Sequence, residues 1–158
     1  MEFLSATCRA ALVVVFAAAV YGKARDLPGF ARSLVEARLV GSRWRTWAAA
    51  GILTAEAAAV LLLLLPGRYG FAAAAAVSAV LTAGVAVTVA RGVKAPCLCF
   101  GATAQPLGPV HLARNAALTC AGVLGLAAAD SVAPAAWLTG AVVAVLLIRL
   151  DDLRSVFR

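Results

Sequence analysis

Acidic side chains and histidine are scarce in this chain. Its 158 residues include 7 Asp and Glu together and 1 His, and charged residues make up only 13% of the total. A soluble domain of this length needs far more polar surface to cover its apolar core. The sequence also has no Ser- or Gly-rich linker and no internal repeat. These absences argue against a soluble protein and favour a single domain over residues 1–158.

Hydrophobic residues dominate instead. They make up 64% of the chain, whose mean hydropathy is +0.98. Runs of roughly 18 or more apolar residues are long enough to cross a bilayer as helices. We therefore expect an all-α, multi-pass protein of the cell membrane: a four-helix transmembrane bundle, a fifth C-terminal spanning helix, and an amphipathic interfacial helix between the first two spans. The expected spans are 4–21, 47–65, 71–90, 112–129 and 133–150.

Two further predictions concern the first span and the connection between the last two spans. A cleaved signal peptide is the alternative for the first span, but Glu2 precedes the apolar stretch and Lys23 and Arg25 follow it, which is unlike a signal peptide. The last two spans are separated by a very short connection at Asp130 and Ser131. We therefore expect these two helices to pack as a tight antiparallel pair.

Basic residues are distributed unevenly between the connections. The net charge is +7, but the charges flank apolar spans rather than forming one patch, so we expect no nucleic-acid partner. Five spans place twelve Lys and Arg residues on one side and only Arg9 and Arg68 on the other. The positive-inside rule then predicts an external N-terminus and a cytoplasmic connection after residue 90.

The first connection, 23–46, is too polar to span a bilayer, and segment 28–41 lies within it. Phe30, Leu34 and Leu39 recur near helical spacing with charged residues between them, and Pro28 suits a first helical turn. We expect a short amphipathic helix along the interface, on the same membrane face as the connection after residue 90. It either covers that connection or serves only as an interfacial anchor.

That connection contains the sequence Pro96-Cys97-Leu98-Cys99-Phe100-Gly101. Cysteines two residues apart point to nearly opposite sides of an α-helix, but Pro96 and Gly101 favour a turn or extended backbone. In such a backbone the two sulfurs approach disulfide range within a strained, easily reduced ring. The pair therefore predicts thiol–disulfide chemistry.

Positive charge near the pair favours its thiolate form, since Arg91, Lys94 and His111 are close in sequence. Three other interpretations remain: two unreactive residues, a lipidation site, or a metal site. Two thiols and one His leave a tetrahedral metal site short of a ligand, so we expect no metal.

Other polar or reactive residues lie inside the spans. Cys8 and Cys120 are expected to pack as small apolar residues. Arg9, near the outer end of the first span, is expected to extend its side chain to the interface. The small residues Gly84, Gly122 and Gly125 are expected to permit close helix packing.

Glu56 is the most conspicuous of these polar residues. A carboxylate at bilayer depth is costly unless it is protonated, paired or facing water, which makes it a candidate catalytic residue beside Cys97 and Cys99. It either moves protons during thiol oxidation, contacts a quinone-like acceptor, or has a structural partner, for which the sequence offers Arg114, Asn115 or Thr82. His111 is either an interfacial residue or a proton donor.

Taken together, these segments resemble the methylamine-utilisation MauE branch of the MauE/DoxX redox-associated membrane proteins. The resemblance covers about residues 5 to 130 in the family's order and rough spacing. The Cys-x-Cys-Phe-Gly motif after Arg-Gly is its most specific part. The matching pieces are Tyr21 to Phe30 with Ser33-Leu34, Glu56, Arg91-Gly92, Pro96 to Gly101, and Leu112 to Asn115.

The resemblance implies a multi-pass bundle that handles disulfides together with a thioredoxin-like partner and helps to mature a disulfide-rich periplasmic protein. It adds Lys23, Asp26 and Asn115 to His111 and Arg114 as supporting residues. The arrangement is also similar to that of vitamin K epoxide reductase-type enzymes, which use two cysteine pairs and a quinone. The first connection, 23–46, contains no cysteine. The family role implies thiols outside the cytoplasm, whereas the charge distribution predicts them inside.

The leading hypothesis is a membrane thiol–disulfide redox component. Cys97 and Cys99 exchange electrons with the thioredoxin-like partner, Cys97 being the attacking sulfur, and Glu56 supplies proton or acceptor contacts. Whether it is itself a thiol–disulfide oxidoreductase is left open, and a quinone is a candidate cofactor. The alternative is a non-enzymatic scaffold or small transporter with a structural cysteine pair.

Overall fold

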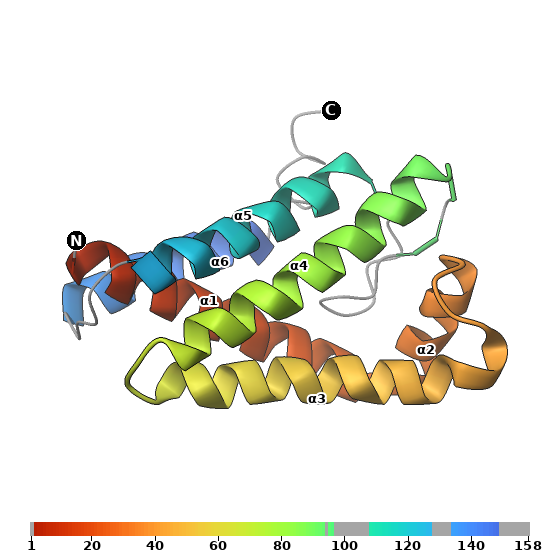
Figure 1. The fold of residues 1–158 in the computed structure, drawn as a ribbon, viewed down its shortest axis with the longest axis horizontal. Helices are drawn as coiled ribbons and strands as arrows, with labels where there is room; N and C mark the ends of the chain where they lie inside the picture. The colour runs from red at the N-terminus through yellow and green to blue at the C-terminus, as the bar shows by residue number, and fades with distance from the viewer. Residues whose placement is uncertain (1, 94, 97–107, 128–133, 149–158) are drawn as a thin grey trace.

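Long α-helices account for most of the structure, a computed structural model that describes residues 2–93, 95–96, 108–127 and 134–148. Helices α1 (Glu2–Arg25), α3 (Arg45–Leu64), α4 (Tyr69–Ala90) and α5 (Pro109–Ala127) run side by side along the molecule (Figure 1). The shorter elements are α2 (Leu27–Glu36), the 3-10 turn η1 (Ser42–Trp44) and α6 (Pro134–Ile148). The described residues contain no strand, and the expected all-α membrane fold is confirmed.

Four helices are long and apolar enough to cross a membrane. These stretches are Phe3–Arg25, Ser42–Leu64, Tyr69–Ala90 and Pro109–Ala127, and they match the first four expected spans. The chain is therefore a multi-pass membrane protein. The fifth expected span, 133–150, lies partly outside the described residues. Its described part, α6, has 15 residues.

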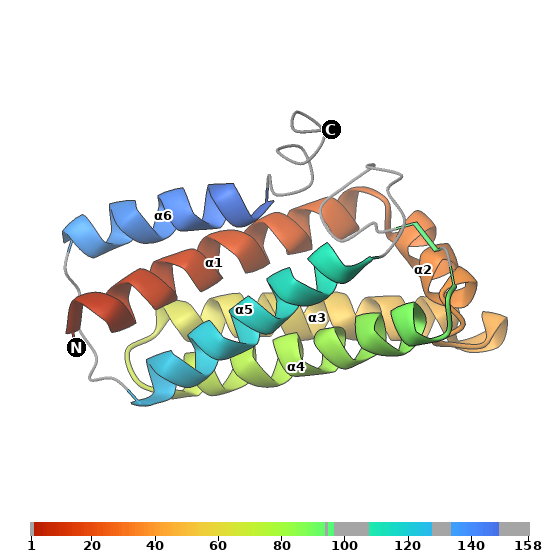
Figure 2. The same ribbon diagram turned by 90° about the horizontal axis from the view of Figure 1, so that it is seen from above.

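The last helix packs differently from expectation. We expected α6 to pair with α5 because their connection is short, but α6 instead lies along α1 (Figure 2). Small residues explain the choice: a Cβ atom at Gly140 would come 2.5 Å from the Thr7 carbonyl oxygen and 2.6 Å from Ala10 Cβ. The backbones of α1 and α6 approach closely at this point, as small residues permit in membrane helices.

Close packing also holds α4 against α5. A Cβ atom at Gly122 would lie 2.9 Å from Ala75 Cβ, and one at Gly125 would overlap the Phe71 ring. The expectation for these two glycines is confirmed. Gly84 differs, because its nearest neighbour would be Leu39 Cδ1 at 3.5 Å, which is ordinary van der Waals contact.

Helix α2 lies at one end of the bundle, the end where α4 finishes and α5 begins (Figures 1 and 2). Its first turn is fixed by Asp26, whose Oδ1 accepts a hydrogen bond from the Gly29 amide at 2.9 Å, with Pro28 in the first turn. Phe30 and Leu34 turn inward against Ala49 of α3. The observed helix, Leu27–Glu36, therefore covers most of the predicted segment 28–41. Its position along a membrane interface stays a prediction.

Two side chains inside the first and fourth spans behave otherwise than expected. Arg9 does not reach outward: it is buried, donates hydrogen bonds to the carbonyl oxygens of Leu63, Leu65 and Gly67 at 2.8, 2.8 and 3.0 Å, and lies 4.6 Å from the Phe71 ring centroid. It thus satisfies carbonyls left unpaired at the end of α3. Cys8 is buried as expected, but Cys120 is exposed on α5, so the expectation of packing is wrong for Cys120.

Candidate functional site

A buried ion pair joins α1 to α3. Lys23 Nζ lies 2.7 Å from Glu56 Oε1 and 2.8 Å from Oε2, and each side chain is only 1% exposed. Both ions have left water, so each depends on the other for its stability in the apolar interior. The structural partners suggested by sequence were Arg114, Asn115 and Thr82, and that suggestion is wrong: the partner is Lys23, 33 residues away.

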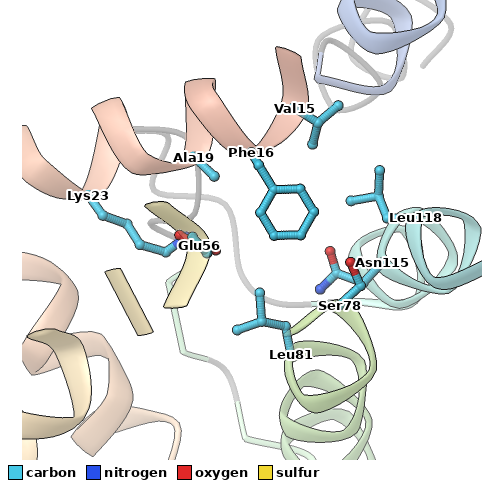
Figure 3. Close-up of a pocket in the computed structure, with 9 residues that line it drawn as sticks. All are labelled: Val15, Phe16, Ala19, Lys23, Glu56, Ser78, Leu81, Asn115 and Leu118. Atoms are coloured by element: carbon cyan, nitrogen blue, oxygen red, sulfur yellow. The ribbon is translucent and has the colours of Figure 1, made fainter. Parts of the chain in front are cut away.

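The geometry of the two helices explains this pairing. Lys23 lies in the last turn of α1, and its side chain points toward Glu56 of α3 (Figure 3). Thr82, by contrast, donates to the Ser78 carbonyl at 2.6 Å and approaches Thr119 Oγ1 at 3.4 Å. Its hydroxyl is therefore engaged along α4 and toward α5.

Helix α2 covers the ion pair from one side. The Lys23 ammonium lies 5.2 Å from the centroid of the Phe30 ring, within the range of a cation–π contact. Asp26 acts indirectly, because its carboxylate caps α2 and so orients the turn that carries Phe30. Two residues that the sequence suggested as supporting, Lys23 and Asp26, thus belong to one local structure.

A small cavity of about 20 Å³ adjoins the ion pair, between α1, α4 and α5 (Figure 3). Its polar lining consists of Lys23, Glu56, Ser78 and Asn115, and its apolar lining includes Phe16 and Leu118. Ser78 Oγ is buried and has no hydrogen-bond partner among the described residues. A space of this size, with several polar neighbours, suits about one water molecule.

Ser78 was missed by the sequence reasoning. The signal available was a hydroxyl within the apolar span 71–90, but a serine in a membrane helix usually bonds to its own backbone and attracts no notice. Only the packing of α4 against α3 and α5, with α1 on the other side of the cavity, brings this hydroxyl near Glu56.

Three residues suggested as supporting lie together at the start of α5. His111, Arg114 and Asn115 are 5%, 3% and 7% exposed, so all three point into the protein although they occupy the first two turns. Of these, Asn115 reaches the small cavity. His111 is accordingly a buried residue rather than one at the protein surface.

Cys97 and Cys99 lie outside the described residues. The residues that flank their connection are described: the Arg91 guanidinium donates to the Arg38 carbonyl oxygen at 3.1 Å, and Pro96 lies beside α2 and α4 as part of a cavity lining. Both contacts are at the end of the bundle that carries α2. Within the described part of the chain, no group of three or more His, Cys, Asp or Glu side chains is arranged to hold a metal ion.

Four membrane-spanning helices around a buried ion pair, with an amphipathic helix closing one end, define a polytopic membrane protein built for a bilayer environment. Comparison with protein families identifies the family within this class. The family described as methylamine utilisation protein MauE matches residues 1–128, so the chain belongs to this family and is a membrane protein associated with methylamine utilisation. The resemblance drawn from the motifs is thereby confirmed. Neither curated proteins nor solved structures provide a match.

Proposed function

We propose that this protein is a membrane thiol–disulfide redox component that works with a thioredoxin-like partner and supports the maturation of disulfide-containing proteins. Cys97 and Cys99 are the exchanging thiols. The observation that carries the proposal is the family match, because its range includes the Cys97-x-Cys99 motif. The buried Lys23–Glu56 ion pair adds titratable groups inside the same bundle.

The exchange proceeds in two balanced steps. The Cys97 thiolate attacks a disulfide of the partner, which forms a mixed disulfide and releases one partner thiolate. The Cys99 thiolate then attacks the Cys97 sulfur, which closes the Cys97–Cys99 bond and releases the second partner thiolate. The pair loses two electrons, the partner gains them, and the two protons given up by the thiols are taken up by the partner thiolates or by nearby bases.

Glu56 and Lys23 are suited to handling such protons. Protonation of the carboxylate leaves an ammonium without its partner, and deprotonation of the ammonium leaves a carboxylate without its partner, so the pair resists both changes until a compensating charge arrives. The adjoining cavity, with Ser78 and Asn115 in its lining, has room for about one water molecule that could exchange a proton with the pair. Arg114, in the first turns of α5, carries positive charge that favours thiolate, and His111 beside it is a candidate to tune the thiols.

Differential alkylation in native membranes tests the thiol cycle. Cys8 and Cys120 are first replaced by alanine, because the exposed Cys120 thiol would itself label. Labelling of the remaining pair with a maleimide should rise after treatment with reductant, and a Cys99→Ser variant should accumulate a mixed disulfide with a thioredoxin-fold protein. Labelling that is the same with and without reductant contradicts cycling.

A scaffold or small transporter is the second candidate. It is favoured by the same ion pair, since charges at bilayer depth also mark solute and proton pathways. In this case the Cys97→Ser, Cys99→Ser double variant retains function whereas Glu56→Gln loses it. The redox proposal expects both to lose it, so complementation of the host by the two variants separates the candidates.

A further inference from the structure

A second, larger cavity lies beneath α2. It has a volume of about 230 Å³, is partly open, and is lined by α2 with the turn that follows it, α3, α4, Pro96 and the start of α5. Its lining is largely apolar and includes Phe30, Leu34, Ile52 and Val85. An apolar cavity of ~150 Å³ is known to stay free of water and to accept a benzene ring. The cavity under α2 therefore has room for a ring with substituents.

Gly84 keeps this space open. It lies within α4, lines the cavity and faces the side chain of Leu39 from the turn after α2. A Cβ atom added there would meet only Leu39 Cδ1, at 3.5 Å, so the absent side chain leaves room for a ligand and does not serve a close contact between helix backbones. This differs from Gly122 and Gly125, where neighbouring atoms already occupy the space.

One polar side chain marks the inner end of the cavity. Asn115 lines it and is only 7% exposed, and its side-chain amide makes no hydrogen bond to another described residue. The amide opens onto the cavity, so a ligand that filled the space without bonding to it would leave the amide buried and unpaired, at a cost of about 1–3 kcal/mol. Ser33 also lines the cavity; its hydroxyl donates to the Phe30 carbonyl at 2.8 Å and so retains acceptor capacity.

We propose that the cavity under α2 binds a lipid-soluble ring compound that carries a carbonyl or hydroxyl oxygen, the chemistry of a quinone head group. The ring fills the apolar space and its oxygen bonds to the Asn115 amide. A saturated acyl chain could fill the same space but would leave this amide without a hydrogen bond. This difference favours the oxygen-bearing ring. Binding at this cavity requires neither Cys97 nor Cys99, so the site is separate from the proposed thiol exchange.

Binding to the purified full-length protein in phosphatidylcholine nanodiscs tests the proposal. The probe is decylubiquinone, and the matched compound is decylbenzene, which has the ring and tail without the oxygens. Isothermal titration should give saturable binding of decylubiquinone at one site per chain. Loss of one hydrogen bond corresponds to about a tenfold weaker affinity, which is the difference expected for decylbenzene.

Two variants test the cavity and the amide separately. Gly84→Leu fills the space and should abolish saturable binding, while Gly51→Leu is its control because a Cβ at Gly51 has no atom within 4 Å. Asn115→Leu should weaken decylubiquinone about tenfold and leave decylbenzene unchanged. Each variant must first have the same thermal unfolding midpoint as the parent protein. If Gly84→Leu is less stable than the parent, the affinity of Asn115→Leu for decylubiquinone tests the proposal.

Three results overturn the proposal. Equal, unsaturable uptake of both compounds means partition into lipid, and undiminished binding to Gly84→Leu places the ligand elsewhere. A phospholipid that copurifies in the cavity and is not displaced by decylubiquinone shows that an acyl chain is the occupant. The Cys97→Ser, Cys99→Ser variant should bind as the parent does, so failure of the thiol cycle and failure of this site are distinguishable.

Discussion

Lys23 donates to both carboxylate oxygens of Glu56, at 2.7 and 2.8 Å, from a helix that meets α3 only through tertiary packing. Neither residue has access to bulk water, at 1% exposure each. The pair therefore acts as one unit in which each charge is tolerable because the other is present.

Single and double replacements of this pair should have opposite effects on stability. Glu56→Leu or Lys23→Met alone leaves a buried charge without its partner and should lower the free energy of unfolding by about 3–5 kcal/mol. The double variant removes both charges and should recover most of that loss, while remaining inactive if the pair handles protons. Unfolding by sodium dodecyl sulfate from mixed micelles measures the stabilities. A double variant as unstable as the singles, or one that is fully active, contradicts this account.

Arg9 should be a strong structural residue. Its guanidinium satisfies three carbonyl oxygens at the end of α3 and lies over the Phe71 ring. Arg9→Met keeps a side chain of similar length but leaves these carbonyl oxygens buried without a donor. It should therefore lower the free energy of unfolding by about 2–4 kcal/mol. Arg32→Met, at an exposed position on α2, is the matched control and should change stability by less than about 0.5 kcal/mol. Equal effects of the two would argue against the role given to Arg9.

Glycine positions in the bundle should separate into two kinds. At Gly125 an added Cβ overlaps the Phe71 ring, so Gly125→Ala should destabilise by about 1–3 kcal/mol. At Gly51 the added Cβ meets no atom within 4 Å, and Gly51→Ala should be neutral or stabilising by up to about 1 kcal/mol. Thermal unfolding in detergent compares the two. A stabilising Gly125→Ala would mean that α4 and α5 can move apart without cost.

Thiol accessibility should distinguish the four cysteines before any redox experiment. In folded protein Cys120, which is exposed on a membrane-spanning helix where thiolate is disfavoured, should react only slowly with a membrane-permeant maleimide, and the buried Cys8 should not react until the protein is denatured. In the Cys8→Ala, Cys120→Ala background, an impermeant maleimide should label Cys97 and Cys99 from the cytoplasmic side, as the charge distribution predicts. Arg68→Cys, at an exposed position in the α3–α4 turn, should label from the opposite side. Labelling of the native pair from outside reverses the predicted orientation.

Hydropathy sufficed to identify the membrane class and the four long spans, because length and apolarity are local properties of the chain. The start of α2 was equally local: Asp26, Pro28 and Gly29 form its first turn from neighbouring atoms. The motif resemblance also identified the family, since Cys-x-Cys-Phe-Gly and Glu56 keep their order and spacing in the chain.

What the sequence could not predict are the contacts between helices. Helix α6 packs against α1 rather than against its sequence neighbour α5. The close approach at Gly140 that allows this depends on the shapes of two helix faces. In the same way, Glu56 was recognisable as a costly buried carboxylate, but its partner Lys23 emerged only when α1 and α3 packed. Ser78 and Asn115 became neighbours of one cavity for the same reason.

The sequence by itself determined that this chain is a membrane protein, which segments form its long helices, and to which family it belongs, because each of these follows from residues close together along the chain. Only the tertiary structure decided which charges neutralise each other and where space remains between the helices. In an apolar solvent, a buried charge must find its partner within reach of its own side chain, and that reach is set by packing.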